Sequence, residues 1–200
     1  MHLSDYRMLK LIKYNKWIQN KLEVNLYNYK IFKGKYIEYD TNGKGKEYYY
    51  ENGTLVYEGE YLNGERNGKG KEYDNDGNLV FEGEYLNGKR NGKGKEYGYN
   101  GELKFDGEYL KGERWNGKIK EFNYNYASKF EGEYFNGEIN GSGKEYYSDD
   151  KIKFEGEYLN GKRWNGRGYV GNGYMEYELI NGNGKVKEYH SFNYMLKFEG

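Results

Sequence analysis

Few residues of this chain are of the types that catalyse reactions or hold metal ions. The chain has two histidines, His2 and His190, and no cysteine. Neither histidine has a second histidine or a cysteine as a metal-binding partner, so we expect both to be solvated side chains. The Gly-x-Ser-x-Gly context of a hydrolase nucleophile is missing around each of the serines, which are Ser4, Ser128, Ser142, Ser148 and Ser191.

Three further patterns resemble functional motifs only in part. The Gly-Lys-Gly-Lys run at 68–71 is rich in the residues of phosphate loops but lacks the GxxxxGK[ST] frame and the helix that follows it. The segment 72–77 with Glu82 begins with Glu and closes one residue too early for a calcium loop. Glutamates that could form a glycosidase pair recur beside lysines, which indicates a solvated, salt-bridged face. We therefore predict no catalytic site, no metal and no cofactor, and we expect a protein that is not an enzyme.

The composition predicts an ordered protein with a thin core. Glycine supplies 31 residues and tyrosine 27, proline is absent, and aromatic residues make up 20% of the chain. Disordered segments are poor in aromatic residues, whereas a Tyr ring can bury one face and keep its hydroxyl in water. Lysine plus arginine and aspartate plus glutamate balance at 32 each, so attraction to nucleic acid is not expected. The lack of a membrane-spanning run, a signal-peptide core and cysteine favours a cytoplasmic location.

A repeat dominates the sequence from residue 32 onward. The string aromatic-Glu/Asp-Gly-Glu-Tyr begins at Tyr57, Phe81, Phe105, Phe130 and Phe154, at spacings of 24, 24, 25 and 24 residues. Looser copies begin at Phe32 and Met175, and the chain stops three residues into an eighth copy. We therefore expect about seven units plus a truncated eighth over residues 32–200, after an N-terminal segment of residues 1–31.

Each unit reads as a β-hairpin. In residues 81–85, Phe81, Gly83 and Tyr85 share one face of a strand, and Glu82 and Glu84 share the other. Asn-Gly pairs at 87–88 and 91–92 supply the positive backbone angles of tight turns. Tandem hairpins of this kind predict a mainly β fold, an elongated single-layer antiparallel sheet.

Glycine has a mechanical role in such a sheet. A position without a side chain lets a neighbouring ring lie flat on the backbone, so stacked rings can fill one face. On the other face, we expect Glu82 and Glu84 to pair with Lys93 and Lys95. No single repeat buries enough apolar surface, so stability should come from contacts between neighbouring repeats.

The string YEGEYLNGERNGKGKEY at 57–73 resembles the MORN (membrane occupation and recognition nexus) repeat. That unit runs aromatic-Glu-Gly-Glu-aromatic, two residues, Gly, then His-Gly-x-Gly and a second strand, and the resemblance covers roughly residues 32–200. The family's tryptophan is tyrosine here, at Tyr61, Tyr85, Tyr109, Tyr134 and Tyr158. Its histidine is asparagine, at Asn67, Asn91, Asn116, Asn140 and Asn165. The resemblance implies association with a membrane or the cytoskeleton.

The N-terminal segment has the pattern of a short amphipathic α-helix. Ser4-Asp5 is a helix start, and apolar residues follow at helical spacing, at Met8, Leu11, Tyr14, Ile18 and Leu22. Six basic residues against two acidic ones give residues 1–31 a charge of about +4. We favour a helix that caps the first hairpin. The alternative is a helix that binds a partner or an anionic membrane surface through Lys10, Lys13, Lys16 and Trp17.

The aromatic rows are the strongest candidates for binding. Part of them forms the core, but a single-layer sheet has no second layer to cover the rest, which would leave an aromatic face for a protein partner. The candidate residues are Tyr61, Tyr85, Tyr109, Tyr134, Tyr158, Tyr73, Tyr97, Phe122 and Tyr146. We predict a scaffold for protein–protein interaction. The alternatives are a membrane-surface adaptor and an antitoxin-like protein that binds a toxin, and exposed sheet edges also allow a homodimer.

Overall fold

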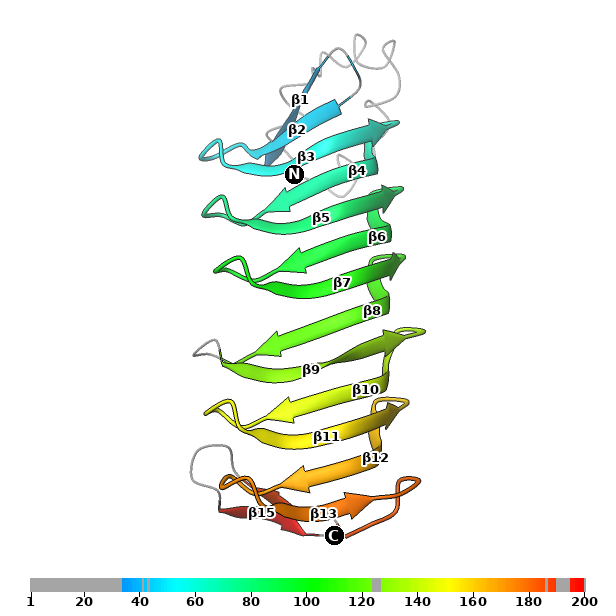
Figure 1. Ribbon diagram of the computed structural model, residues 1–200. Coiled ribbons are helices and arrows are strands. Elements are labelled where there is room, and N and C mark those ends of the chain that lie inside the picture. The colour runs from blue at the N-terminus through cyan, green and yellow to red at the C-terminus, as the bar shows by residue number, and fades with distance from the viewer. Residues whose placement is uncertain are drawn as a thin grey trace, which may run out of the picture.

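The chain forms a long, open, antiparallel sheet of 13 strands in which each strand pairs with the next one in sequence (Figure 1). This computed structural model describes residues 34–40, 42, 44–123, 127–185, 187–189 and 195–199. The strands are β1 (Lys35–Tyr39), β2 (Lys44–Tyr49), β3 (Leu55–Leu62), β4 (Glu65–Tyr73), β5 (Leu79–Leu86), β6 (Lys89–Tyr97), β7 (Leu103–Leu110), β8 (Glu113–Phe122), β9 (Ser128–Phe135), β10 (Glu138–Tyr146), β11 (Ile152–Leu159), β12 (Lys162–Tyr169) and β13 (Met175–Leu179). The expected mainly β, single-layer fold is confirmed.

The repeating arrangement ends at β13. Two further strands, β14 (Lys187–Tyr189) and β15 (Leu196–Glu199), pair with each other in a separate two-stranded sheet. By sequence, β14 is the second strand of the unit that begins at Met175, so the two strands of this unit lie in different sheets. The helix expected within residues 1–31 lies outside the described residues. Within the described part of the chain, no helix is long and apolar enough to cross a membrane.

The tight turns of successive hairpins all lie along one edge of the sheet. Asn87 and Gly88 have φ angles of 50° and 78°, and positive values at both central residues suit the right-handed twist of the flanking strands. The turns after β3, β7, β9 and β11 show the same pair of positive angles. All these turns lie along one long edge, on the right in Figure 1, and the longer connectors lie along the other.

The core is a single file of aromatic rings lying on glycine backbone. Tyr57, Phe81, Phe105 and Phe154 are fully buried although the sheet has only one layer. A β-carbon added at Gly94 would lie 2.5 Å from Cζ of Phe81, which shows how closely the ring approaches the backbone. The predicted role of the glycines is confirmed.

Each ring also contacts the ring of the next repeat. The Phe81 ring meets Tyr85 of its own strand at a centroid distance of 5.5 Å and Tyr109 of the following repeat at 5.1 Å, both edge to face. Such pairs add about 0.5–1.5 kcal/mol beyond the area that they bury. Neighbouring repeats are therefore held together by the same rings that form the core.

We predict that Gly94→Ala destabilises the sheet by about 1–3 kcal/mol, because its methyl group must displace the Phe81 ring from the backbone. Urea unfolding followed by circular dichroism measures this loss. Lys93→Ala, at the exposed neighbouring position, is the control and should change the midpoint little. An unchanged or higher midpoint for Gly94→Ala would contradict the ring-on-glycine packing.

Candidate interaction surface

A row of arginines covers the aromatic face of the sheet. The guanidinium carbon of Arg66 lies 4.2 Å from the centroid of the Tyr57 ring, and that of Arg90 lies 4.1 Å from the Phe81 ring. Arg114 and Arg163 cover Phe105 and Phe154 in the same way. A guanidinium over a ring face gains cation–π attraction while its alkyl stem packs on apolar surface. The arginines thus take the place of the second layer that the sheet lacks.

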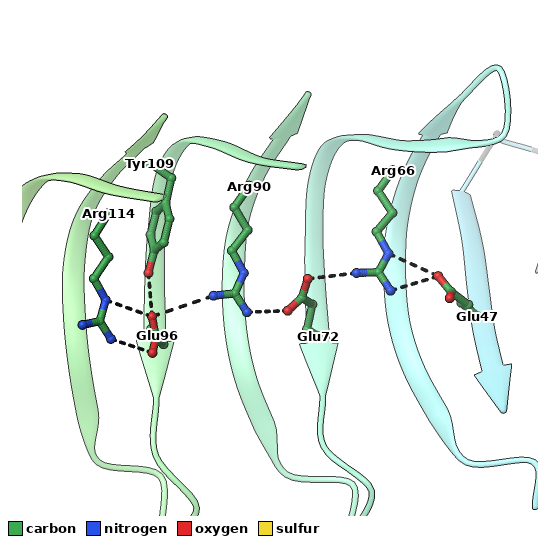
Figure 2. A network of polar contacts seen from close by, with 7 residues as sticks. All are labelled: Glu47, Arg66, Glu72, Arg90, Glu96, Tyr109 and Arg114. Atoms are coloured by element: carbon green, nitrogen blue, oxygen red, sulfur yellow. Dashed lines mark hydrogen bonds and ion pairs between the residues drawn. The ribbon is translucent and has the colours of Figure 1, made fainter. Parts of the chain in front are cut away.

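These arginines form a chain of ion pairs with glutamates on the same face, which we call the arginine–glutamate ladder. It runs through Glu47, Arg66, Glu72, Arg90, Glu96 and Arg114 (Figure 2). Nη2 of Arg66 lies 2.9 Å from Glu47, and Nη1 lies 2.8 Å from Glu72. Arg66 and Arg90 therefore each join carboxylates of two repeats, and Arg114 ends this row of ion pairs.

A second, shorter stretch of the ladder lies near the other end of the sheet, where Arg163 pairs with Glu145 at 2.6 Å. Between the two stretches, β10 carries Ile139 at the position of the arginine, and Ile139 packs against the core instead. The ladder was not predicted from the sequence. An arginine directly before Asn-Gly, at 66, 90 and, with one inserted Trp, 114 and 163, was the signal that could have revealed it.

Three glutamates of the ladder, Glu47, Glu96 and Glu145, have lowered pKa values. Burial alone would raise the pKa of Glu96, but hydrogen bonds and charge attraction from Arg114 hold that pKa below its usual value. The pKa values of Glu47 and Glu145 are lowered in the same way by Arg66 and Arg163. A carboxyl group that must donate a proton in catalysis needs the opposite shift. The arrangement therefore suits a structural role rather than acid–base chemistry.

We predict that the protein loses stability as the pH falls below about 4.5, the ordinary pKa of Glu96. Because the folded-state pKa values of these glutamates are lowered, their stabilisation is complete above the unfolded-state value and disappears as the pH falls through the folded-state value. Thermal unfolding between pH 7 and pH 2.5 measures the decline.

The variant Glu96→Gln isolates the contribution of the ladder to this profile. It should lose about 2–4 kcal/mol at pH 7, because Arg114 keeps its buried charge without a carboxylate, and its stability should fall less steeply in acid. Glu51→Gln, in an exposed connector, is the control. If both variants followed the pH profile of the unmodified chain, the ladder would not carry the acid sensitivity.

The nine aromatic candidates do not share one face. Tyr85, Tyr109 and Tyr158 belong to the buried ring file under the arginines, with 3%, 3% and 6% of their surface exposed. Tyr61 and Tyr134 are partly buried against the same cluster. The first row is therefore mainly core and leaves no open aromatic groove.

The second row, which is Tyr73, Tyr97, Phe122 and Tyr146, lies on the opposite face. Glu72 is opposite Phe81 in the register, so strand alternation turns the next residue, Tyr73, away from the rings. The Tyr73 hydroxyl donates to Glu58 at 2.7 Å, and those of Tyr97 and Tyr146 donate to Glu82 and Glu131. Burial and the bond to Glu58 raise the pKa of Tyr73 to about 12, which keeps it a proton donor. The expectation that both rows face the same side is wrong.

This opposite face is hollowed along the length of the sheet, and we call the hollow the charged trough. Two adjoining hollows of about 1060 and 1020 Å³ meet at Asp106. Their walls are formed by the outward-facing Glu, Asp, Lys and Arg side chains of β1–β13, with strand glycines between them. The trough therefore crosses nearly the whole array of repeats.

The charged side chains of the trough alternate in sign from strand to strand. Glu82 lies opposite Lys95 in the register, as expected, but its ion pair, at 3.9 Å, is with Lys71 of the preceding hairpin. Glu84 accepts a hydrogen bond from the backbone N–H of Lys93 rather than from its ammonium group. Ion pairs between acidic and lysine side chains thus occur on this face, but Glu82 pairs with Lys71 and Lys95 with Asp106 instead of the predicted partners.

The asparagines that replace the family's histidine connect successive turns. The side-chain oxygen of Asn91 accepts a hydrogen bond from the backbone N–H of Lys111, in the turn of the next hairpin, at 3.2 Å. Next to it, the N–H of Gly112 donates to the carbonyl of Arg90 at 2.9 Å. Equivalent bonds are made by Asn67, Asn116, Asn140 and Asn165. These asparagines have a structural role along the turn edge that the sequence did not reveal.

We predict that Asn91→Ala costs about 1 kcal/mol of stability, because the N–H of Lys111 loses its acceptor. Asn91→Asp keeps an oxygen in place and should lose clearly less. Urea unfolding of both variants gives the comparison. Equal losses would mean that the hydrogen bond does not hold the turns together.

Lys10, Lys13, Lys16 and Trp17, the candidate residues of the N-terminal helix, lie outside the described residues. The structure therefore adds nothing to the prediction of a membrane-binding or partner-binding helix, and the choice between a cap and a binding helix stays a prediction.

Comparisons with known proteins agree with the hairpin repeat. The MORN repeat family model matches residues 57–79, 81–102 and 130–151. No curated protein sequence matches the chain. Among solved structures, a crystal structure of TarM is similar at 16% identity and a TM-score of 0.33, over 66% of this chain and 27% of that one. A TarM variant of S. aureus in complex with fondaparinux, α-GlcNAc-glycerol and UDP is similar at 15% identity and a TM-score of 0.33, over 78% of this chain and 27% of that one. The chain thus spans about a quarter of the length of these proteins. Three of its hairpin units are MORN repeats.

Proposed function

We propose that this chain is a non-catalytic scaffold that binds a polypeptide segment of a protein partner along the charged trough. The observation that carries the proposal is the trough itself, a hollow that follows the repeats across the sheet and is lined by charges of alternating sign. A partner segment with charged residues of both signs would find complementary groups along the whole array.

The ion pairs of the trough are weak enough to be exchanged for contacts with a partner. Lys71–Glu82 and Lys95–Asp106 are 3.9 and 3.8 Å long, and their side chains are 37–53% exposed. Exposed pairs of this kind contribute about 0–1 kcal/mol each. The partly exposed Tyr73 and Tyr97 add contact area of the kind that binding surfaces favour.

The aromatic face offers no comparable opening. The ladder side chains that cover it are 13–25% exposed and are held by short, multiple contacts. A partner would have to break these pairs to reach the rings, leaving buried charges without partners. The trough is therefore the better candidate for binding, and the aromatic face is the better candidate for stability.

Two properties support a function without catalysis. Arginines lower the pKa values of Glu47, Glu96 and Glu145 and so hold these three carboxyl groups in their ionised form, which removes them as proton donors. Among the residues that the structure describes, no three His, Cys, Asp or Glu side chains gather as a metal site requires. The charged groups of this sheet are arranged to pair with one another or with a binding partner.

Membrane association remains the alternative and rests on the basic N-terminal segment with Lys10, Lys13, Lys16 and Trp17. Toxin binding by an antitoxin-like protein is a special case of the scaffold proposal, since a toxin would be one polypeptide partner among others. A cytoplasmic location suits all of these functions.

The trough can be tested with a displayed peptide library selected against the full chain. Selected peptides should bind less tightly, by about tenfold or more, to the variant Lys71→Glu with Lys95→Glu, because two attractive charges become repulsive. Lys111→Glu with Lys185→Glu makes the same change of net charge outside the trough and should leave the affinity unchanged. Fluorescence anisotropy measures both affinities.

Equal weakening by the two variants would show that net charge rather than the trough governs binding. If the selection gave no trough-dependent peptide while the chain floated with vesicles containing phosphatidylserine, the membrane alternative would replace the scaffold proposal.

A further inference from the structure

A row of exposed apolar side chains follows the turn edge of the sheet. The turns after β3, β5, β7, β9, β11 and β13 each follow one large apolar residue, and this residue is 39–62% exposed. We call this row the turn ridge, and it consists of Leu62, Leu86, Leu110, Phe135, Leu159 and Ile180. Together these side chains present on the order of 500 Å² of apolar surface, a size at which exposed patches mark interaction sites.

The ridge is regular because the turns are joined. Hydrogen bonds to the asparagine side chains connect successive turns. The glycine N–H of each turn connects them as well, because it donates to a carbonyl of the preceding hairpin. One ridge residue therefore follows the next at the spacing of two strands, roughly 9–10 Å. A second sheet whose repeats have the same spacing could therefore contact this row over its full length.

A charged residue stands across the turn from each ridge residue. The registered pairs are Leu62 with Glu65, Leu86 with Lys89, Leu110 with Glu113, Phe135 with Glu138 and Leu159 with Lys162. These five charged residues are exposed. Within the described part of the chain, none of their side chains forms an ion pair or a hydrogen bond. From β3 to β12 the order of charges is acid, base, acid, acid, base.

We propose that two copies of this chain associate side by side and antiparallel through their turn ridges. Reversal of the charge order places Glu65 opposite Lys162 of the second copy and Lys89 opposite Glu138 of the second copy. Glu113 then meets Glu113 of the second copy on the two-fold axis. Because each charged residue lies one strand after its ridge residue, Leu62, Leu86 and Leu110 meet Ile180, Leu159 and Phe135 of the second copy. Four of the five charged positions thus find an opposite charge, in an interface that closes on itself.

Other registers are disfavoured by the same charges. In a parallel arrangement, each of the five charged residues meets its own copy. An antiparallel arrangement with Phe135 on the axis would place Lys89 opposite Lys162 and Glu113 opposite Glu138, and one with Leu110 on the axis would place Glu65 opposite Glu138. Like charges at an interface select against such pairings. The charge order therefore specifies one register as well as one partner, a second copy of the same chain.

The inference does not depend on the charged trough, because the ridge lies at the turn edge. The combined buried area, on the order of 1000 Å² plus the charged rim, is at the lower end of specific interfaces. The association should accordingly be reversible and concentration-dependent, which sedimentation velocity of the full chain can follow.

Cysteine cross-linking can read the register directly, because the chain has no cysteine of its own. With a mild oxidant, Leu110→Cys should form a disulfide-linked mixed dimer with Phe135→Cys. Leu62→Cys should remain a monomer alone but form a mixed dimer with Ile180→Cys. Tyr99→Cys, which is 72% exposed on the connector edge, is the control and should not cross-link. Failure of Leu110→Cys to cross-link with Phe135→Cys, or self-linking of Leu62→Cys, would overturn the proposed register.

Charge reversal provides an independent measurement. Glu65→Lys alone and Lys162→Glu alone should each weaken dimerisation about tenfold in sedimentation velocity, since each faces a like charge in the second copy. An equimolar mixture of the two variants should recover the original affinity. A mixture that stays as weak as its components, or an unmodified chain that is monomeric at every concentration, would refute the antiparallel pair.

Discussion

Aromatic rings pressed onto glycine backbone are the interaction on which the rest of this structure depends. A sheet of one layer has no opposing layer to cover its apolar face, yet Phe81 is fully buried. The ring reaches this state because Gly83 and Gly94 have no side chains and let it approach the backbone. Since each ring also meets the next repeat, as Phe81 meets Tyr109, the core and the repeat-to-repeat interface are the same contact.

The arginine–glutamate ladder follows from that arrangement. A flat ring on one side of the sheet needs a flat cover. Guanidinium is planar and holds five donors in a fixed fork, whereas the lysine ammonium group is a compact point charge. Where Ile139 replaces the arginine in β10, its apolar side chain packs against the ring core. The same cover is thus built once from charged pairs and once from apolar side chains, which identifies covering the rings as the constraint.

The sequence could predict the parts that depend on local alternation. Phe81, Gly83 and Tyr85 lie on one face because they are spaced by two residues, and Asn87-Gly88 turns because both residues accept positive φ. The two rows of tyrosines were placed on one face because rings were assumed to lie inward and carboxylates outward. Strict alternation along β6 instead places Glu96 on the face with the rings and Tyr97 on the opposite face. The reason, Arg114, lies 18 residues from Glu96 and becomes a neighbour only when the register is known.

A repeat turns every side chain at a fixed position into a row, so the role of a row depends on its exposure rather than on its composition. The ladder and the trough are both built from acidic and basic residues. Arg66 in the ladder is 18% exposed and bound to two carboxylates, whereas Lys71 in the trough is 48% exposed and reaches one carboxylate at 3.9 Å. Arg66 cannot be separated from its partners without leaving a buried charge unpaired. Lys71 exchanges partners at little cost in free energy, because water already competes for its ammonium group. Stability and binding can therefore reside on opposite faces of one sheet without interfering with each other.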